Sequence, residues 1–148
     1  MTDPTARQAL RRTLRAHRNT LTDSDQAAAA RKLAARVAGS RLFHVSRRIA
    51  LYLPNDGEID PGPLLDRARA MKKVFYLPIL SRLRHDRLWF APYVPDGALM
   101  LNRFGIPEPA VPARHWVRAQ DLDLILMPLV AFDARGNRLG MGGGFYDK

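Results

Sequence analysis

The chain has 148 residues, with 24 lysines and arginines against 14 aspartates and glutamates, which gives a formal net charge of +10 at neutral pH. This length suits one domain with a single core, and a hydrophobic fraction of 47% excludes a disordered chain. No apolar run approaches the length of a membrane span, and the cationic N-terminus lacks the apolar stretch of a secretory signal. The absence of cysteine excludes disulfide scaffolds and thiolate chemistry, and we expect a cytoplasmic protein.

The positive charge favours polyanionic partners, which include nucleotide phosphates, polycarboxylate substrates and nucleic acid. Composition does not choose among these three classes. Arginine supplies nearly all of the cations, and part of the excess charge can equally be a solvated surface.

The first predicted element is an amphipathic helix. Asp3 and Pro4 suit the N-cap and the first turn, and apolar residues then recur at helical spacing as far as Leu21. Four arginines share one face of this helix: Arg7, Arg11, Arg15 and Arg18. Like charges on one face destabilise an isolated helix, so this stripe needs an anion. From charge alone, a solvated face or an RNA-binding helix explains the stripe better.

A capping box introduces a second helix. Thr22 and Asp25 have the required spacing, although Asp replaces the usual Glu or Gln. The alanine-rich segment that follows ends near Val37, and Gly39 is its C-terminal stop. We interpret this helix as scaffold.

The middle of the chain has the pattern of a βαβ unit. Segments 48–53 and 74–77 are predicted strands, and they flank a helix over 60–71. Glu58 follows the first strand across a turn, and ligands bind at the carboxyl ends of parallel strands in open α/β sheets. Glu58 is therefore a candidate site residue, although from position alone an ordinary loop acid is the more common case.

Residues 88–93 are predicted to form a third strand, with Pro92 near an edge or an end of the sheet. Trp89 and Phe90 point to opposite faces of this strand, so one belongs to the core and the other can border a ligand. The pattern does not say which.

A glycine-rich stretch follows a predicted buried strand over 122–127. Gly136, Gly140 and the run 142–144 allow positive φ angles and a close approach of the backbone to a ligand. Successive exposed N–H groups of such a loop can form an anion-binding nest, which is strongest where the loop opens a helix.

Charged residues surround these glycines. Arg138 adds a cation with five donors, and Asp133 and Asp147 could hold a divalent metal that is shared with phosphate oxygens. The spacing fits neither GxGxxG nor GxxxxGK[ST]. Spacing alone therefore leaves a glycine-rich hairpin turn with a flexible tail as an equal interpretation.

Taken whole, the string from 123 to 148 resembles the signature of the 5-formyltetrahydrofolate cyclo-ligase family, which is close to D-L-I-hydrophobic-hydrophobic-P-hydrophobic-hydrophobic-hydrophobic-F-D-x-x-G-x-R-L-G-x-G-x-G-Y-Y-D-R. The matching residues are Asp123, Leu124, Ile125, Pro128, Phe132, Asp133, Gly136, Arg138, Leu139, Gly140, Gly142, Gly144, Tyr146 and Asp147. Phe145 and Lys148 stand where the family commonly has Tyr and Arg. Segment 104–109 matches the family's F-G-I-x-E-P, in which Phe104 either lines the substrate pocket or is a buried plug.

This resemblance implies an α/β fold: a three-layer sandwich with a mixed, partly parallel central sheet flanked by helices, and an N-terminal helical pair. The implied activity is the ATP-dependent cyclisation of 5-formyltetrahydrofolate to 5,10-methenyltetrahydrofolate, with release of ADP and phosphate. ATP is then a co-substrate and Mg²⁺ a cofactor. The implied protein is a monomer that binds neither nucleic acid nor membrane.

The resemblance also implies roles for particular residues. Leu53 and Glu58 would contact the pterin, and Arg7 and Arg11 the ATP. The loop residues that would contact ATP are Arg138, Leu139, Gly140, Met141, Gly142, Gly143, Gly144, Phe145 and Tyr146. Those that would contact the substrate are Met141, Gly142, Gly143, Gly144 and Phe145. Arg138 and Tyr146 would be catalytic, and Asp147 would hold the metal.

Family members continue for some dozens of residues beyond the Y-Y-D-R end of the signature. We therefore expect a single domain over 1–148 that is truncated after the glycine-rich motif. Two alternatives stay open: a catalytically impaired remnant that binds folate or nucleotide, and a basic nucleic-acid-binding module.

Overall fold

The computed structural model of the chain describes residues 3–80 and 87–147. Its helices are α1 (Pro4–Arg18), α2 (Asp23–Ala38), α3 (Arg41–Val45) and α4 (Gly62–Ala70). Its strands are β1 (Arg48–Ala50), β2 (Val74–Ile79), β3 (Trp89–Tyr93), β4 (Leu99–Leu101), β5 (Pro107–Pro109), β6 (Val117–Arg118), β7 (Leu124–Ile125), β8 (Ala131–Phe132) and β9 (Arg138–Leu139). Three 3₁₀ turns complete the order: η1 (Ala113–His115), η2 (Ala119–Asp121) and η3 (Phe145–Asp147).

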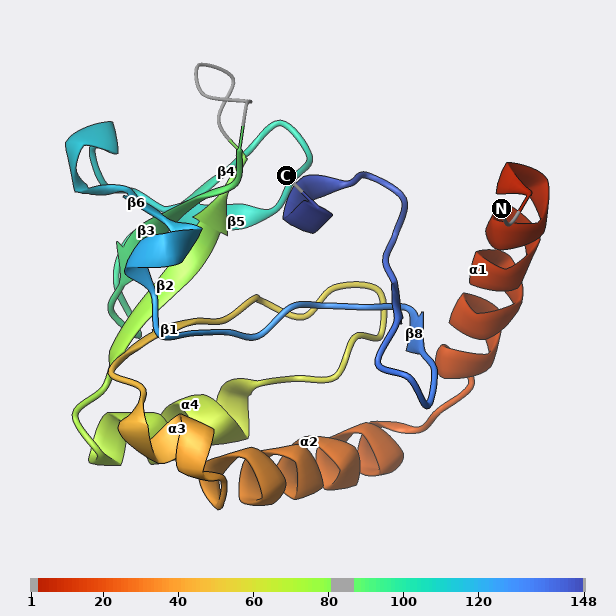
Figure 1. The fold of residues 1–148 in the computed structure, drawn as a ribbon, viewed down its shortest axis with the longest axis horizontal. Coiled ribbons are helices and arrows are strands. Elements are labelled where there is room, and N and C mark those ends of the chain that lie inside the picture. The colour runs from red at the N-terminus through yellow and green to blue at the C-terminus, as the bar shows by residue number, and fades with distance from the viewer. Residues whose placement is uncertain (1–2, 81–86, 148) are drawn as a thin grey trace.

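The central sheet has five strands in the order β6-β3-β2-β1-β7. Strand β1 pairs in parallel with β2 and with β7, whereas β3 pairs antiparallel with β2 and β6. The predicted βαβ unit is β1-α4-β2, and the mixed, partly parallel sheet with helices is confirmed. Figure 1 shows α2, α3 and α4 together on one side of the sheet, while α1 stands apart from them.

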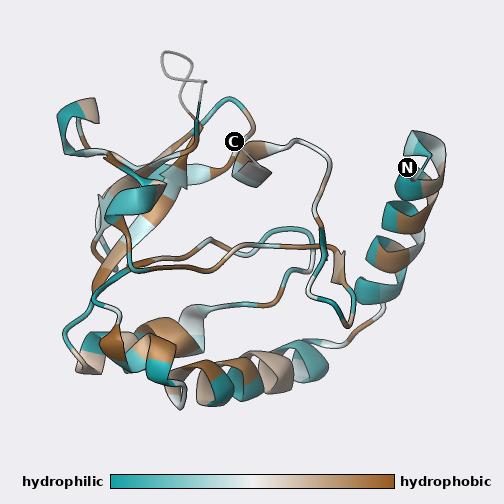
Figure 2. Ribbon diagram, viewed as in Figure 1, coloured by the Kyte–Doolittle hydropathy of each residue, from teal (hydrophilic) through white to brown (hydrophobic). Residues whose placement is uncertain are grey.

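Local hydrogen bonds explain why the first two helices begin where the sequence predicts. The Asp3 carboxylate accepts from the Thr5 amide at 3.0 Å. Thr22 and Asp25 form the reciprocal capping box, with both bonds at 3.1 Å. Helix α1 nevertheless buries none of its residues, although Figure 2 shows hydrophilic and hydrophobic residues alternating along it.

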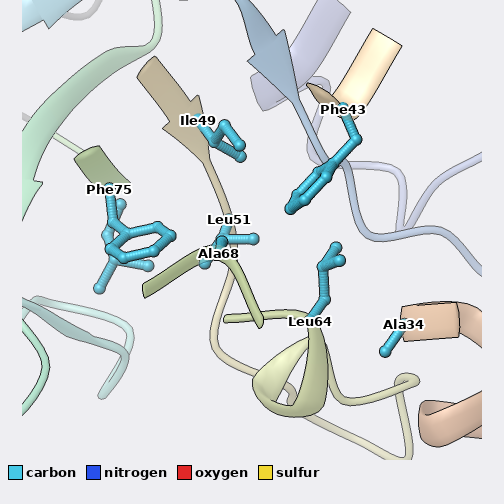
Figure 3. Close-up of a cluster of buried hydrophobic side chains, with 8 residues drawn as sticks. Ala34, Phe43, Ile49, Leu51, Leu64, Ala68 and Phe75 are labelled. Carbon is cyan, nitrogen blue, oxygen red and sulfur yellow. The ribbon is translucent and has the colours of Figure 1, made fainter. Parts of the chain in front are cut away.

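Two hydrophobic clusters lie on opposite faces of the sheet, because successive strand side chains alternate. The first is formed by Ala34, Phe43, Ile49, Leu51, Leu64, Ala68, Phe75 and Leu77. Figure 3 shows these side chains converging from the strands and from α2, α3 and α4. The second contains Ala50, Tyr76, Leu88 and Phe90, and Phe145 and Tyr146 pack against it. The end of the glycine-rich segment is thereby anchored to the sheet.

The strand predicted over 48–53 is shorter, ending at Ala50, and the one predicted over 74–77 extends to Ile79. Three other predicted segments also differ in detail from the structure. The strand expected over 122–127 is only β7, which is half-buried because it lies at the edge of the sheet with β1 as its partner. Strand β3 is internal, but β6 pairs only with Trp89 and Phe90, so Pro92 lies beyond that ladder. The extended loop expected over 104–109 is partly β5, which pairs with β4 in a two-stranded ribbon.

Within the described part of the chain, none of the helices is both long enough and apolar enough to cross a bilayer.

Candidate functional site

A cavity of about 730 Å³ opens between α1, the segment after β1, the β4–β5 ribbon and the glycine-rich segment. Every residue predicted to contact nucleotide or substrate lines it: Arg7, Arg11, Leu53, Glu58, Arg138, Leu139, Gly140, Met141, Gly142, Gly143, Gly144, Phe145 and Tyr146. The fold therefore collects in one place residues that are spread over the whole sequence. Their individual roles stay predictions.

The glycine loop is shaped for close approach. Gly142 has a φ of 101° and Gly144 a φ of 68°, which are angles that L side chains rarely adopt. A Cβ on Gly142 would lie 3.5 Å from the Arg11 guanidinium carbon. Arg11 also donates from Nε to the Gly140 carbonyl at 2.8 Å. The N-terminal helix and the glycine loop thus meet directly at the cavity.

The other predicted structure for this region, a hairpin turn, is present just upstream. Strands β8 and β9 pair antiparallel around the turn that contains Gly136, whose φ is 83°. The Asp133 carboxylate accepts from the amides of Arg135 and Asn137, both at 2.9 Å, and from the Asn137 side chain at 2.8 Å. These bonds lower the Asp133 pKa, the side-chain bond from Asn137 most. Asp133 therefore stabilises a turn and does not line the cavity.

Arg138 and Tyr146 both line the cavity, and their side chains lie close to each other. The guanidinium carbon of Arg138 lies 5.9 Å from the centre of the Tyr146 ring, at the outer range of a cation–π contact. A Cβ on Gly140 would lie 2.7 Å from Arg138 Nη1. Burial raises the pKa of Tyr146, and the nearby Glu58 charge adds to the rise. Tyr146 consequently stays protonated at neutral pH and offers a neutral hydroxyl.

Glu58 provides the carboxylate of the cavity. Its Oε2 accepts from the Asn55 amide at 3.0 Å, which leaves the second oxygen for a ligand. Burial raises the Glu58 pKa, and the bond from Asn55 opposes that rise. Sequence reasoning missed its neighbour Tyr52, which lines the cavity and donates from its hydroxyl to the Ile59 carbonyl at 2.7 Å. The available signal was the position of Tyr52 directly before the turn that carries Glu58.

The exposed fractions of the aromatic residues distinguish core residues from residues that line the cavity. Phe90 is 1% exposed and belongs to the core, and neither Phe90 nor Trp89 lines the cavity. Phe104 is 55% exposed, so it is not a buried plug. It lines the cavity and packs edge-on against Phe145, with ring centres 5.9 Å apart.

The turn of the β4–β5 ribbon contributes a further polar group to the cavity wall, which sequence reasoning also missed. The Oδ1 of Asn102 accepts from the amides of Phe104 at 2.8 Å and Ile106 at 3.1 Å. Its Nδ2 is a buried donor without a partner among the described residues. Asn102 therefore holds the ribbon turn that presents Phe104 to the cavity.

Comparison with known proteins decides the family. The model of the 5-formyltetrahydrofolate cyclo-ligase family matches residues 3–148. The chain belongs to this family. The Haemophilus influenzae 5-formyltetrahydrofolate cyclo-ligase is 38% identical over 142 residues, which covers 96% of this chain and 76% of that protein. The Escherichia coli cyclo-ligase is 37% identical over 135 residues, which covers 91% of this chain and 74% of that protein.

Solved structures agree with this assignment. The 5,10-methenyltetrahydrofolate synthetase of Aquifex aeolicus has a TM-score of 0.79 and 30% identity, over 95% of this chain and 70% of that one. The Mycoplasma pneumoniae synthetase has a TM-score of 0.70 at 20% identity, which shows the likeness of fold alone. The resemblance drawn from the glycine-rich string is confirmed as membership of the cyclo-ligase family.

The predicted metal ligand of this cyclo-ligase family member is Asp147, and its side chain lies outside the part of the chain that the structure describes. Among the described residues, no three acidic or histidine side chains form a group that could hold a metal ion. Glu58 is the only carboxylate among the described residues that line the cavity.

Proposed function

We propose that this chain catalyses the ATP-dependent cyclisation of 5-formyltetrahydrofolate to 5,10-methenyltetrahydrofolate, with release of ADP and phosphate. The observation that carries the proposal is that Glu58, the α1 residues Arg7 and Arg11, and the glycine loop all line the same cavity. A carboxylate suits the N–H groups of a pterin, and arginines with a glycine-rich backbone suit phosphates. Membership of the cyclo-ligase family supports both assignments.

The proposed chemistry asks for positioning more than for a strong base. The formyl oxygen attacks the terminal phosphorus of ATP and ADP leaves, which activates the formyl carbon as a phosphorylated iminium. N10 then attacks that carbon, its proton is lost, and the oxygen departs with phosphate. Arg138 and the backbone N–H groups of the glycine loop would stabilise the transferring phosphoryl group, with Arg7 and Arg11 on the other phosphates. Glu58 would orient the pterin.

Magnesium would neutralise charge on the phosphate oxygens, and Asp147 is the residue that we propose holds it. Mg²⁺ is commonly bound by one or two protein carboxylates together with phosphates and water, so a dedicated acidic cluster is not required. With Asp147 as the metal ligand, Glu58 would bind the pterin. The protonated Tyr146 would donate a hydrogen bond to substrate or nucleotide.

We favour a nucleotide over nucleic acid as the partner of the α1 arginines, because the stripe faces other segments of the protein and the cavity. Arg11 contacts Gly140, and both Arg15 and Arg18 contact Asp56. The single Asp56 carboxylate neutralises only part of this charge, and Arg7 and Arg11 present the rest to the cavity and not to a duplex. We further propose that the protein acts as a cytoplasmic monomer.

The test is the appearance of the absorbance of methenyltetrahydrofolate when 5-formyltetrahydrofolate, ATP and Mg²⁺ are mixed with the protein. Omission of ATP or Mg²⁺ should abolish it. Equilibrium binding of both ligands without turnover would instead identify an impaired remnant. Binding of RNA with steep salt dependence and no affinity for either ligand would identify a nucleic-acid-binding module.

A further inference from the structure

Polar contacts contribute to the position of α1, which has no fully buried residue and stands apart from the other helices (Figure 1). Three of these contacts meet on the turn after β1. Arg15 donates from Nε to Oδ2 of Asp56 at 2.6 Å. Arg18 donates from Nη2 to the Asp56 carbonyl at 2.7 Å and to its Oδ2 at 3.4 Å. We call Asp56 with Arg15 and Arg18 the helix clamp.

The clamp is more than a solvent-exposed ion pair. The side chain of Arg18 is 15% exposed and that of Asp56 26% exposed, so water screens this pair only in part, whereas Arg15, which makes the shorter contact, is 39% exposed and more strongly screened. Arg18 also donates from Nη1 to the Leu129 carbonyl at 3.0 Å, which joins the clamp to the segment before β8. The Arg15 guanidinium, through its hydrogen bond, lowers the Asp56 pKa.

The backbone at the clamp indicates a tightly determined geometry. Among the described residues, Asp56 is one of three non-glycine residues with positive φ, at 52°, a conformation that asparagine and aspartate tolerate better than most residues. Gly57 follows with a φ of 75°, and a Cβ there would lie 2.6 Å from Oδ1 of Asn19. The turn therefore fits directly against the C-terminal end of α1.

The clamp lies between the two ligand-binding parts of the proposed site. Its turn carries Glu58 two residues beyond Asp56, and its helix carries Arg11 and Arg7 one and two turns before Arg15. Arg7 is roughly 12 Å from Arg15 along the helix axis at 1.5 Å per residue, so a tilt of about 10° at the clamp would move Arg7 by ~2 Å. A displacement of that size breaks a hydrogen bond to a phosphate.

We propose that Asp56 is a positioning residue: by holding Arg15 and Arg18 it orients α1 so that Arg7 and Arg11 face the nucleotide while Glu58 faces the folate. The inference rests on the proposed function for the identity of the ligands. Because α1 contributes no fully buried residue to the core, the clamp governs where the helix lies more than whether the domain folds.

Asp56→Asn tests this role. Asparagine keeps an acceptor and tolerates positive φ, so the turn is preserved while the charge that holds two arginines is lost. We expect the Kd for Mg-ATP to rise roughly 2- to 150-fold, the range of coupling energies between residues of one contact network. The melting temperature should change little. The matched control is Asp96→Asn, which makes the same change at a φ of 68° outside the cavity and should leave the Kd unchanged.

The decisive measurement is a double-mutant cycle on the Kd for Mg-ATP. If Asp56 acts by placing Arg7 and Arg11, Asp56→Asn should have little further effect in a chain that already carries Arg7→Ala and Arg11→Ala. Equal factors in both backgrounds, or no effect of Asp56→Asn on ATP binding, would overturn the inference. Binding of Mg-ATP without cyclisation would count against the proposed function alone, whereas absence of ATP binding in the unmodified chain would overturn both.

Discussion

Replacement of Glu58 by glutamine is predicted to weaken folate binding far more than ATP binding. In the structure, Oε2 of Glu58 accepts from the Asn55 amide at 3.0 Å. A glutamine amide must turn its oxygen toward that N–H, so its NH₂ group takes the place of the free carboxylate oxygen. A ligand N–H that donates to Glu58 in the unmodified protein would then face the glutamine NH₂ group, which is also a donor.

The expected size of the effect follows from this exchange. Loss of a charge-assisted hydrogen bond costs about 1.5–3 kcal/mol. Since 1.4 kcal/mol is a factor of ten, the Kd for 5-formyltetrahydrofolate should rise roughly 10- to 150-fold. The Kd for Mg-ATP should change much less, because Glu58 touches neither α1 nor the glycine loop through any hydrogen bond among the described residues.

The assay is isothermal titration of each ligand into the unmodified protein and the variant. Asp60→Asn is the matched control, because it makes the same carboxylate-to-amide change two residues away. Asp60 is exposed, accepts from the Gly62 amide at 2.8 Å and does not line the cavity. Equal losses of affinity for both ligands, or an equal loss in Asp60→Asn, would refute the placement of Glu58 against the pterin.

Four further predictions concern pH, stability, the phosphate end of the cavity and the core. Burial raises the folded-state pKa of Glu58, so folate affinity should fall on acidification at a higher pH than for an ordinary glutamate, and titrations of Glu58→Gln should be flat there. The same raised pKa makes the contribution of Glu58 to folding stability greatest below its unfolded-state pKa, and this contribution is lost as the pH rises through the folded-state pKa. At neutral pH, Glu58→Gln should therefore have a melting temperature no lower than that of the unmodified chain. In steady-state kinetics, Arg138→Ala should raise the KM for ATP and lower kcat. Arg138→Lys should restore only part of the lost activity, because lysine lacks the planar fork of arginine. Full rescue by lysine would mean that only the positive charge matters at this position. Phe43 is 0% exposed, so Phe43→Ala should lower the free energy of unfolding, measured by urea titration, by about 3–5 kcal/mol. Phe43→Leu should lower it less. A loss below about 1 kcal/mol for Phe43→Ala would contradict the place of Phe43 in the core.

The sequence alone determined the features that depend on neighbours within a few positions. The cap of Asp3 on Thr5 and the reciprocal box of Thr22 with Asp25 span two and three residues, so periodicity and capping chemistry predict them directly. The βαβ unit is equally local in its pattern. The glycine-rich string identified the family because so many positions agree within one short segment.

Tertiary structure decided which of these pieces meet. Arg11 and Gly140 are 129 positions apart, and Arg15 and Asp56 are 41 apart; neither contact leaves a periodic signal in the sequence. The sheet order brings them together, because β7 pairs beside β1 and the chain after β7 runs toward α1, where β8 lies (Figure 1).

The aromatic residues illustrate the same division. Alternation along β3 predicted that Trp89 and Phe90 point to opposite faces, but which face is covered depends on the segments that pack there. Phe90 lies in the cluster that Phe145 and Tyr146 join from the far end of the chain. Phe104 reaches the cavity because the β4–β5 ribbon turns at Asn102 and Gly105. Local patterns specify the elements of this protein, whereas the cavity arises from pairings between distant segments, whose free energies depend on the assembled sheet.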